Sequence, residues 1–167
     1  MRFSTKKPSF GQPDFIGPGE RVLAWAPHKT GNLVVTNLAI IDSSEQETFK
    51  LPWELAFSAK WDEPSLTLIS NLQVTSEKLS TLNSATNTKI WQLDEPGLVP
   101  AAVRERITST QIFDQVQTIA GVGKVRFLAR MSPSGVHWAT FTEDEVSSDS
   151  ETAIAAQLHA LRSTLGI

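Results

Sequence analysis

Short apolar segments fill residues 19–70 of the chain, and nearly every break between two of them is a turn signal. The clearest segment, 54–61, alternates apolar and polar side chains with a period of two. This period predicts one half-buried strand face made of Leu55, Phe57, Ala59 and Trp61. The whole series therefore predicts antiparallel strands that fold back on one another.

The boundaries of these strands follow from proline and asparagine. Pro27 and Pro52 are expected to end strands, because proline has no amide hydrogen to give to a ladder. Asn37 is expected to mark a tight turn or a bulge, since asparagine tolerates left-handed backbone geometry. The segment 76–88 is rich in Ser, Thr and Asn and is predicted as a mobile loop or a short weak helix. The expected strands are 20–26, 33–42 with its break at Asn37, 47–51, 54–61, 66–74 and 89–93.

A helix is predicted for residues 101–120, just after a proline that suits a first helical turn. Its apolar residues do not form a single stripe. Val103 and Ile107 point one way, whereas Ile112 and Val116 point nearly opposite. A helix that is apolar on two sides is usually packed between two layers, so we expect this one to be sandwiched.

The last part of the chain reads as a hairpin and a second helix. Two alternating segments, 124–130 and 136–142, flank a Pro-Ser-Gly turn and predict paired strands. Ser148 with Glu151 three residues later forms a capping box at a helix start. Gly166 is expected to end that helix. One apolar stripe runs along it, made of Ile154, Leu158, Leu161 and Leu165.

Strands followed by a closing helix, a hairpin and a further helix indicate an antiparallel α+β protein. We divide the chain into an extended lead-in (1–18), a body of strands with its helix (19–121), and a hairpin and C-terminal helix (122–167) that pack back on the body. The apolar residues of the lead-in are expected to pin it to the body. They are Phe3, Phe10, Phe15 and Ile16.

Six segments carry a family resemblance: GERVLAWA (19–26), VVTN (34–37), LPWELAFSAKWD (51–62), VRERI (103–107), GKVRFLAR (123–130) and SGVHW (134–138). In these segments the chain resembles a group of uncharacterised actinobacterial proteins. The order of elements also resembles the pleckstrin-homology-like (PH-like) domain. The resemblance implies a PH-like β-barrel of six to seven strands with a capping helix, in a small cytoplasmic protein. It implies no activity and no catalytic residues.

Composition narrows the classes of function. The 167 residues carry a net charge of −3, whereas a nucleic-acid-binding domain is usually basic. The chain has no cysteine, which removes disulfides, thiolate metal sites and cysteine nucleophiles. No apolar run approaches the roughly 18 residues of a membrane span, and the N-terminus lacks the apolar core of a signal peptide. We expect a cytoplasmic protein that neither binds nucleic acid nor inserts stably into a membrane.

Motifs for covalent, metal or cofactor chemistry do not stand out. His28, His137 and His159 share no helical or strand spacing, and no G-x-S-x-G elbow occurs. The glycines at 121 and 123 lack the spacing of a phosphate loop and follow a helix instead of preceding one. We therefore expect no metal and no cofactor. The tryptophans on or beside strands are interpreted as core filling, with an aromatic ligand platform as the alternative. They are Trp25, Trp53, Trp61 and Trp91.

A basic stripe is the strongest candidate site. Its residues are expected to lie on the outward face of one strand, at the start of the preceding helix and on the facing strand. This surface would bind an anionic ligand or a partner; otherwise it is a solvated strand face with edge-protecting charges. Its residues are Lys124, Arg126 and Arg130 on the strand, Arg104 and Arg106 on the helix, and His137 opposite.

These observations predict a non-enzymatic binding or scaffold module that engages a protein partner or a second copy of itself. Strand addition at an exposed edge, either of the barrel or of the hairpin strand 124–130, would be the means of binding. Two alternatives stay open. One is an enzyme with a dispersed site of arginine, histidine and acidic groups, and the other is weak binding of anionic lipid headgroups.

Overall fold

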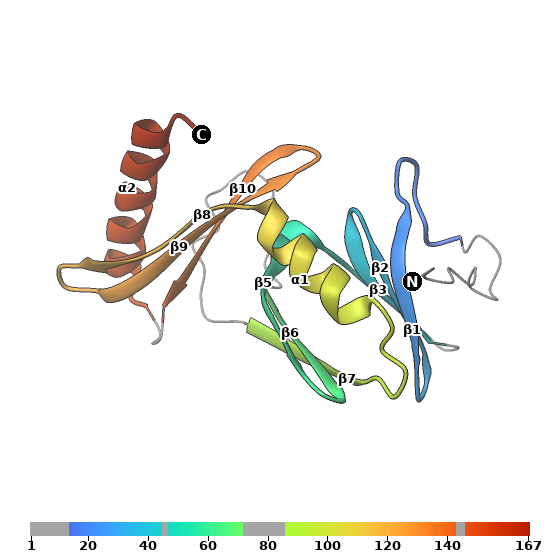
Figure 1. The fold of residues 1–167 in the computed structure, drawn as a ribbon. Coiled ribbons are helices and arrows are strands. Elements are labelled where there is room, and N and C mark those ends of the chain that lie inside the picture. Colours follow the sequence, from blue (N-terminus) through green and yellow to red (C-terminus); the bar gives the residue numbers. More distant parts are fainter. Residues whose placement is uncertain (1–13, 45–46, 72–85, 143–145) are drawn as a thin grey trace.

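The computed structural model describes residues 14–44, 47–71, 86–142 and 146–167 (Figure 1). Over these residues the protein is an α+β structure with ten strands in three antiparallel sheets and two α-helices. Two sheets and the first helix form one unit, residues 14–110, which we call the two-sheet unit. The third sheet and the second helix form the C-terminal unit, residues 111–167, which extends to one side of it (Figure 1).

The two-sheet unit contains seven strands in chain order. The first sheet has the order β1-β2-β3-β4, and the second has the order β5-β6-β7. A short 3₁₀ turn, Trp53–Leu55, joins the two sheets, and helix α1 (Val99–Thr110) follows the last strand. The strands are β1 (Val22–His28), β2 (Gly31–Thr36), β3 (Ala39–Ser44), β4 (Thr48–Pro52), β5 (Ala56–Asp62), β6 (Ser65–Asn71) and β7 (Thr86–Gln92).

The core of the two-sheet unit lies between its two sheets and under α1. Trp53 is 2% exposed at its centre, and its indole nitrogen donates to the carbonyl of Thr36 (2.9 Å). Val99 and Val103 of α1 are buried against the same cluster. No strand of the first sheet pairs with a strand of the second among the described residues, so these residues form no closed barrel.

Two expectations about the first strands have different outcomes. Asn37 does lie in the turn between β2 and β3, where its side chain bonds to Arg21 N and Gly19 O. Pro27 does not end the first strand, because β1 continues to His28. β1 is the edge strand of its sheet, and an edge position tolerates the missing amide hydrogen.

The predicted helix over 101–120 is wrong in its second half. α1 ends at Thr110, and residues Gln111–Ile119 form strand β8, which pairs along its length with β9 (Gly123–Ser132). The apolar residues on two sides therefore belong to two elements: a helix stripe and a strand. Several residues of β8 are β-branched and fit a pleated surface, and the ladder with β9 outweighs weak helix propensity.

The predicted hairpin and C-terminal helix are present. β9 pairs with β10 (Gly135–Thr142), and the sheet order is β10-β9-β8, so β9 is the central strand. Helix α2 (Ser148–Leu165) covers one face of this sheet through Ile154 and Leu158. Its N-cap is Ser147, one residue before the predicted cap, and Gly166 ends it in the left-handed region (φ 71°).

The lead-in is fixed to the outer face of the first sheet where it is described. Phe15 and Ile16 pack there, beside Trp25. Glu20 lies beneath them with a side chain only 1% exposed, and it accepts from Thr36 Oγ1 (2.6 Å), Lys50 Nζ (2.5 Å) and Gly17 N (2.9 Å). Phe3 and Phe10, and most of the predicted loop 76–88, lie outside the described residues.

Candidate functional site

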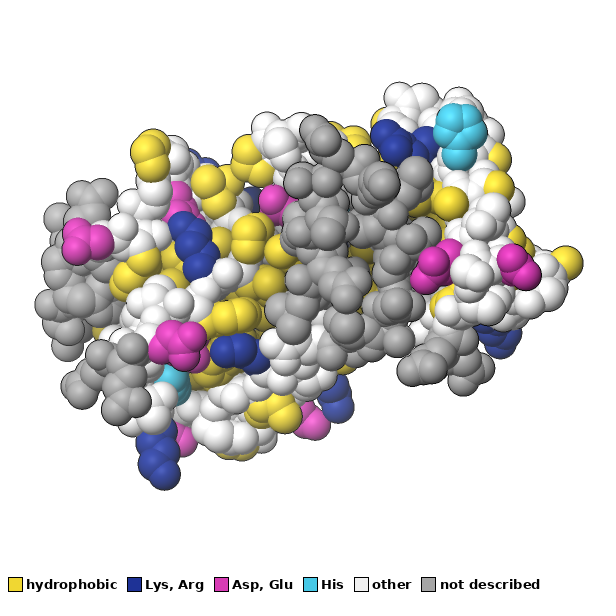
Figure 2. All heavy atoms as spheres, turned by 180° about the vertical axis from the view of Figure 1, so that it is seen from behind, with side chains coloured by type: hydrophobic (Ala, Val, Ile, Leu, Met, Phe, Trp, Pro, Cys, Tyr) yellow, Lys and Arg dark blue, Asp and Glu magenta, His cyan; other side chains and the backbone are white. Residues whose placement is uncertain are grey.

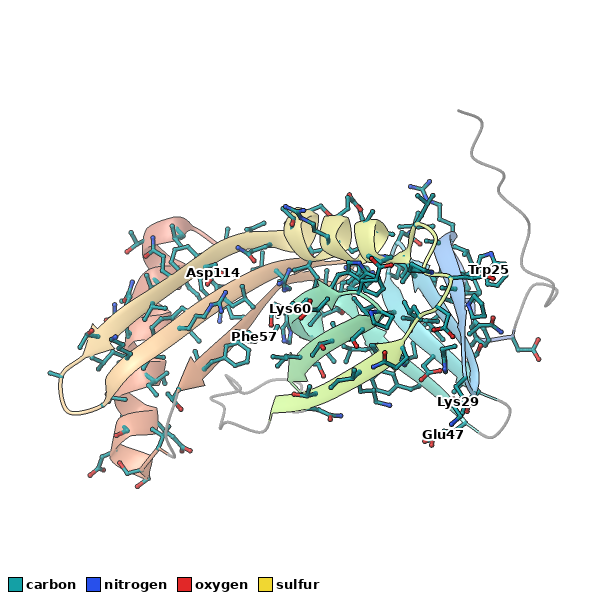
Figure 3. All side chains as sticks on the ribbon, turned by 60° about the horizontal axis from the view of Figure 1, so that its bottom comes forward. Trp25, Lys29, Glu47, Phe57, Lys60 and Asp114 are labelled. Atoms are coloured by element: carbon teal, nitrogen blue, oxygen red, sulfur yellow. The ribbon has the colours of Figure 1, made fainter. Side chains whose placement is uncertain are left out.

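An open groove of about 800 Å³ lies between helix α1 and the strands β5 and β6. In Figure 3, α1 runs above the start of β5, with Lys60 projecting from the strand beneath it. The strands contribute a largely apolar wall, and the helix contributes small and polar side chains. The lining residues on the strands are Ala59, Lys60, Trp61 and Leu66, and those on the helix are Pro100, Ala101, Val103, Arg104, Glu105, Thr108 and Ser109.

One face of α1 is turned toward this groove. Ala101, Arg104, Glu105 and Thr108 follow the i, i+3, i+4, i+7 spacing of a single helical face, and all four are exposed. The opposite face is held in the core by Val99 and Val103. Because the groove side carries no large apolar residue, a space remains between the helix and β5.

The strand beside the groove has an open edge. β5 pairs only with β6 among the described residues, and it is the outer strand of its sheet. In an antiparallel pair, alternate residues point their amide and carbonyl groups away from the partner strand. Among the described residues, the carbonyls of Ala56 and Phe57 both accept hydrogen bonds from Arg130. The part of β5 that follows them borders the groove and has no strand partner on its outer edge within the described residues.

Most charges around the groove already have partners. Lys60 bonds to Asp62 (3.2 Å), with both side chains about three-quarters exposed. Arg106 donates to both carboxylate oxygens of Glu105, and these hydrogen bonds hold the pKa of Glu105 below its usual value. Arg104 makes no ion pair with any residue of the described segments. The charge left free for a ligand in the groove is therefore positive.

Arg130 is buried, which corrects the prediction that it lies on an outward face with Lys124. It is 1% exposed and reaches from β9 into the two-sheet unit. Its guanidinium donates to the carbonyls of Ala56 (2.8 Å), Phe57 (3.3 Å) and Ile107, and to Thr110 Oγ1 (3.0 Å). Burial lowers the pKa of Arg130 to about 10, so it remains charged at neutral pH. This arginine joins β9 to the start of β5 and the end of α1.

Arg126 lies on the same face of β9 as Arg130 but is partly exposed. It forms a two-bond ion pair with Asp114 of β8 (2.6 and 2.5 Å), and its guanidinium stacks 4.5 Å from the ring of Phe57. Figure 3 shows Phe57 of β5 pointing toward the C-terminal sheet, on the side where Asp114 lies. Phe57 also contacts Phe141 of β10, with ring centroids 4.1 Å apart. The contact between the two units through Phe57 therefore combines an aromatic pair with a cation–π contact, whereas the Arg126–Asp114 ion pair lies within the C-terminal unit.

The structure does not gather the six predicted site residues in one place. Arg104 lines the groove, Arg106 is paired with Glu105, and Lys124 is exposed near the start of β9. Arg126, Arg130 and His137 share the face of the C-terminal sheet opposite α2, since Arg130 pairs in register with His137. Burial lowers the pKa of His137, while Glu54 acts in the opposite direction.

A polar cluster that sequence reasoning missed lies in the two-sheet unit. His28 Nε2 is 2.7 Å from one oxygen of Asp42, and Trp91 Nε1 donates to the other oxygen (2.7 Å). Thr30 contacts the other ring nitrogen of His28 at 3.4 Å. These residues come from three strands and a turn, so no spacing in the sequence predicts that they form a cluster. The described residues contain no group of three His, Asp or Glu side chains placed to hold a metal ion.

The tryptophans mostly fill cores, as the first interpretation stated. Trp53 and Trp91 are 2% and 5% exposed between the sheets, and Trp138 is 8% exposed under α2. The indole nitrogen of Trp138 finds no hydrogen-bond partner among the residues that the structure describes. Trp25 and Trp61 are the exceptions, because Trp25 is half-buried on the outer face of the first sheet and Trp61 lines the groove.

Comparison with protein-family models, with curated proteins and with solved structures found no match to this chain. None of the helices in the described segments is long and apolar enough to cross a membrane. On the face seen in Figure 2, lysine and arginine side chains are scattered among acidic ones, over the two-sheet unit and the C-terminal unit alike.

Proposed function

We propose that the protein is a binding module that takes an extended segment of a partner protein into the groove between β5 and α1. The observation that carries this proposal is the open edge of β5 beside a groove that is apolar on its strand side. An added strand would bond to the free backbone groups of β5, and its alternate side chains would face α1. We further propose that the first seven strands and α1 are a PH-like unit; their number, antiparallel order and closing helix support this.

The chemistry of the groove favours a partner segment of a definite kind. Alternate side chains of an added strand would pack on Trp61 and Leu66 and beneath the small residues of α1. Arg104 lacks an acidic partner within the described segments and lies at the same groove. The segment that fits is therefore extended, with apolar residues in alternation and one acidic residue opposite Arg104. Proline is excluded at every second residue of the segment, because the residues that bond to β5 must donate an amide hydrogen.

The two alternatives have weaker support. An enzyme would bring its acid and base groups together in one pocket. Among the residues that line the groove, Glu105 is the one acidic group, and its neighbour Arg104 is a cation. Binding of anionic lipid headgroups would need several unpaired cations on one surface. Arg106 and Arg126 are both engaged by carboxylates.

The proposal is tested by selecting peptides from a displayed library of short random sequences on the intact protein. Ala101→Trp and Thr108→Trp each place a large ring in the groove from an exposed helical position. We expect selected peptides to bind the wild-type protein and to lose at least about tenfold in affinity with either variant, measured by fluorescence anisotropy. Arg104→Glu should lower the affinity of the protein for those selected peptides that carry an acidic residue.

Ala160→Trp is the matched control, because Ala160 is an exposed alanine on the other helix. It should leave peptide affinity unchanged. Selection that enriches no peptide on the wild-type protein, or peptides that bind the Ala101→Trp and wild-type proteins equally, would exclude the groove as the binding site.

A further inference from the structure

We propose that strand β8 is a self-association edge, through which two copies of the chain join their C-terminal sheets into one six-stranded antiparallel sheet. β8 is an outer strand of its sheet and pairs only with β9 among the described residues. Of its nine residues none is buried, whereas β10 at the opposite edge has three buried residues in succession. This proposal is independent of the groove and of what binds there.

The β8 edge lacks the features that normally keep an edge strand from pairing. Protected edges carry lysine, proline or unpaired charges. The sequence of β8, QIFDQVQTI, has none of these. Its one charged residue, Asp114, accepts two hydrogen bonds from Arg126. Ile112 and Val116 are 42% and 60% exposed on this strand. A long, neutral edge with exposed β-branched residues is suited to accepting another strand.

The sequence of β8 is complementary to itself about Val116. When two copies pair antiparallel with Val116 opposite Val116, Gln115 faces Gln117, Asp114 faces Thr118, and Phe113 faces Ile119. Within residues 113–119, each apolar side chain then meets an apolar one, and each polar side chain meets a partner that can form a hydrogen bond with it; Gln111 and Ile112 lie beyond the paired stretch. A foreign strand would have to match this pattern by chance, so a second copy of the chain is the partner that fits.

This register also agrees with the two faces of the sheet. Phe113 and Ile119 lie on the α2 side, packed against the cluster that contains Trp138. Their cross-strand pairing would join the two clusters into one core across the junction. Val116 lies on the opposite side, where it is in register with Arg126. The two Val116 side chains would cover each other there, which accounts for the exposure of this residue in the single chain.

The chain has no cysteine, so a single introduced thiol reports the register directly. Val116→Cys places two thiols opposite each other at the two-fold axis, close to the Cβ separation at which disulfides form. Ile90→Cys is the matched control, because Ile90 is also 60% exposed and lies on an outer strand, β7. We expect the Val116→Cys protein to form a cross-linked dimer at least about tenfold faster than the Ile90→Cys protein under mild oxidation.

Sedimentation equilibrium provides the second measurement. The wild-type protein should sediment with twice the mass of the chain. Val116→Lys should raise the dimer dissociation constant at least about tenfold, because two ammonium groups would meet at the axis, and Ile90→Lys should not change it. Circular dichroism spectra identical to wild type confirm that both variants fold. A wild-type monomer at high protein concentration, a dimer unaffected by Val116→Lys, or equal cross-linking rates for the two cysteine variants would overturn the proposal.

Discussion

The two units of the molecule bury their strands in different ways. The two-sheet unit places two sheets face to face and covers the core with α1, so its largest cluster is enclosed by its own elements. The C-terminal unit has a single sheet with α2 on one face. Its other face is partly covered by Phe57 of the first unit and partly open. The comparison suggests that the C-terminal unit depends on the two-sheet unit more than the reverse.

The largest expected effect comes from Arg130, which joins the units. Arg130→Met keeps an unbranched apolar stem but removes the guanidinium group, which leaves three backbone carbonyls and Thr110 without their donor. We expect a loss of about 3 kcal/mol in the free energy of unfolding, since unsatisfied buried acceptors are costly. Urea unfolding followed by tryptophan fluorescence measures it. Trp138 is the only tryptophan in residues 111–167, so the difference between the fluorescence signals with and without Trp138→Phe reports on the C-terminal unit.

Arg126→Met is the control for this change, because it lies on the same face of the same strand. Its ion pair is partly exposed, and the expected loss is about 1 kcal/mol or less. If both variants lose the same free energy, the buried bonds of Arg130 do not join the units in the way described.

A destabilising substitution confined to the two-sheet unit tests whether the stability of the C-terminal unit depends on that unit. A Cβ atom at Gly31 would lie 2.0 Å from the carbonyl oxygen of Ser43, so Gly31→Ala must push β2 and β3 apart. We expect a loss of about 2 kcal/mol. Amide hydrogen exchange should accelerate in both units, because we expect the stability of the C-terminal unit to depend on its contacts with the two-sheet unit. Unchanged exchange in β8–β10 would show that the C-terminal unit stands alone. Gly17→Ala, whose Cβ would make an ordinary 3.6 Å contact, is the control.

The smallest effect concerns Glu20, which fastens the lead-in to the two-sheet unit. Burial alone would raise its pKa, but bonds from Lys50, Thr36 and Gly17 lower it below the usual 4.5. A carboxyl group with a lowered pKa stabilises the fold above its unfolded pKa, and that contribution is lost as pH falls through the folded pKa. Glu20→Gln should therefore cost about 1 kcal/mol at pH 7 and progressively less below pH 4.5. Thermal unfolding across this range measures it, and a difference that persists at low pH would contradict the assignment.

Alternation and turn residues were enough to predict a strand near 54–61 and the hairpin of β9 and β10. They did not predict the 3₁₀ turn Trp53–Leu55 or the register shift between Ala56 and Ser58, so Leu55 and Phe57 do not continue the regular strand face of Ala59. They were not enough for β8, because Ile112, Val116 and Ile119 recur at spacings of four and three, which also suit a helix. The strand exists because β9 supplies a partner, and a partner is not visible in a local pattern. The error had a consequence: it made β9 look like an exposed edge, whereas β9 is the central strand.

The site residues also show that a local sequence pattern does not reveal contacts with distant parts of the chain. The period of two correctly placed Arg126 and Arg130 on one face of a strand, but it could not tell which of them would be covered. The groups that bury Arg130 are 74 and 23 residues away, at Ala56 and Ile107. The groove is likewise formed by two elements far apart in the chain. Only the small and polar spacing of Ala101, Arg104 and Thr108 offered a signal for it.

Helix α1 passes directly into β8, with Thr110 as the last residue of one and Gln111 as the first of the other. No linker absorbs motion between them, and Arg130 fastens the junction by bonding to Ile107 and Thr110. A tilt of the helix must therefore move the strand. If a guest in the groove shifts α1, the affinity of the proposed dimer at β8 would change with it, and thermodynamic reciprocity would require dimerisation to change the affinity for the guest by the same factor.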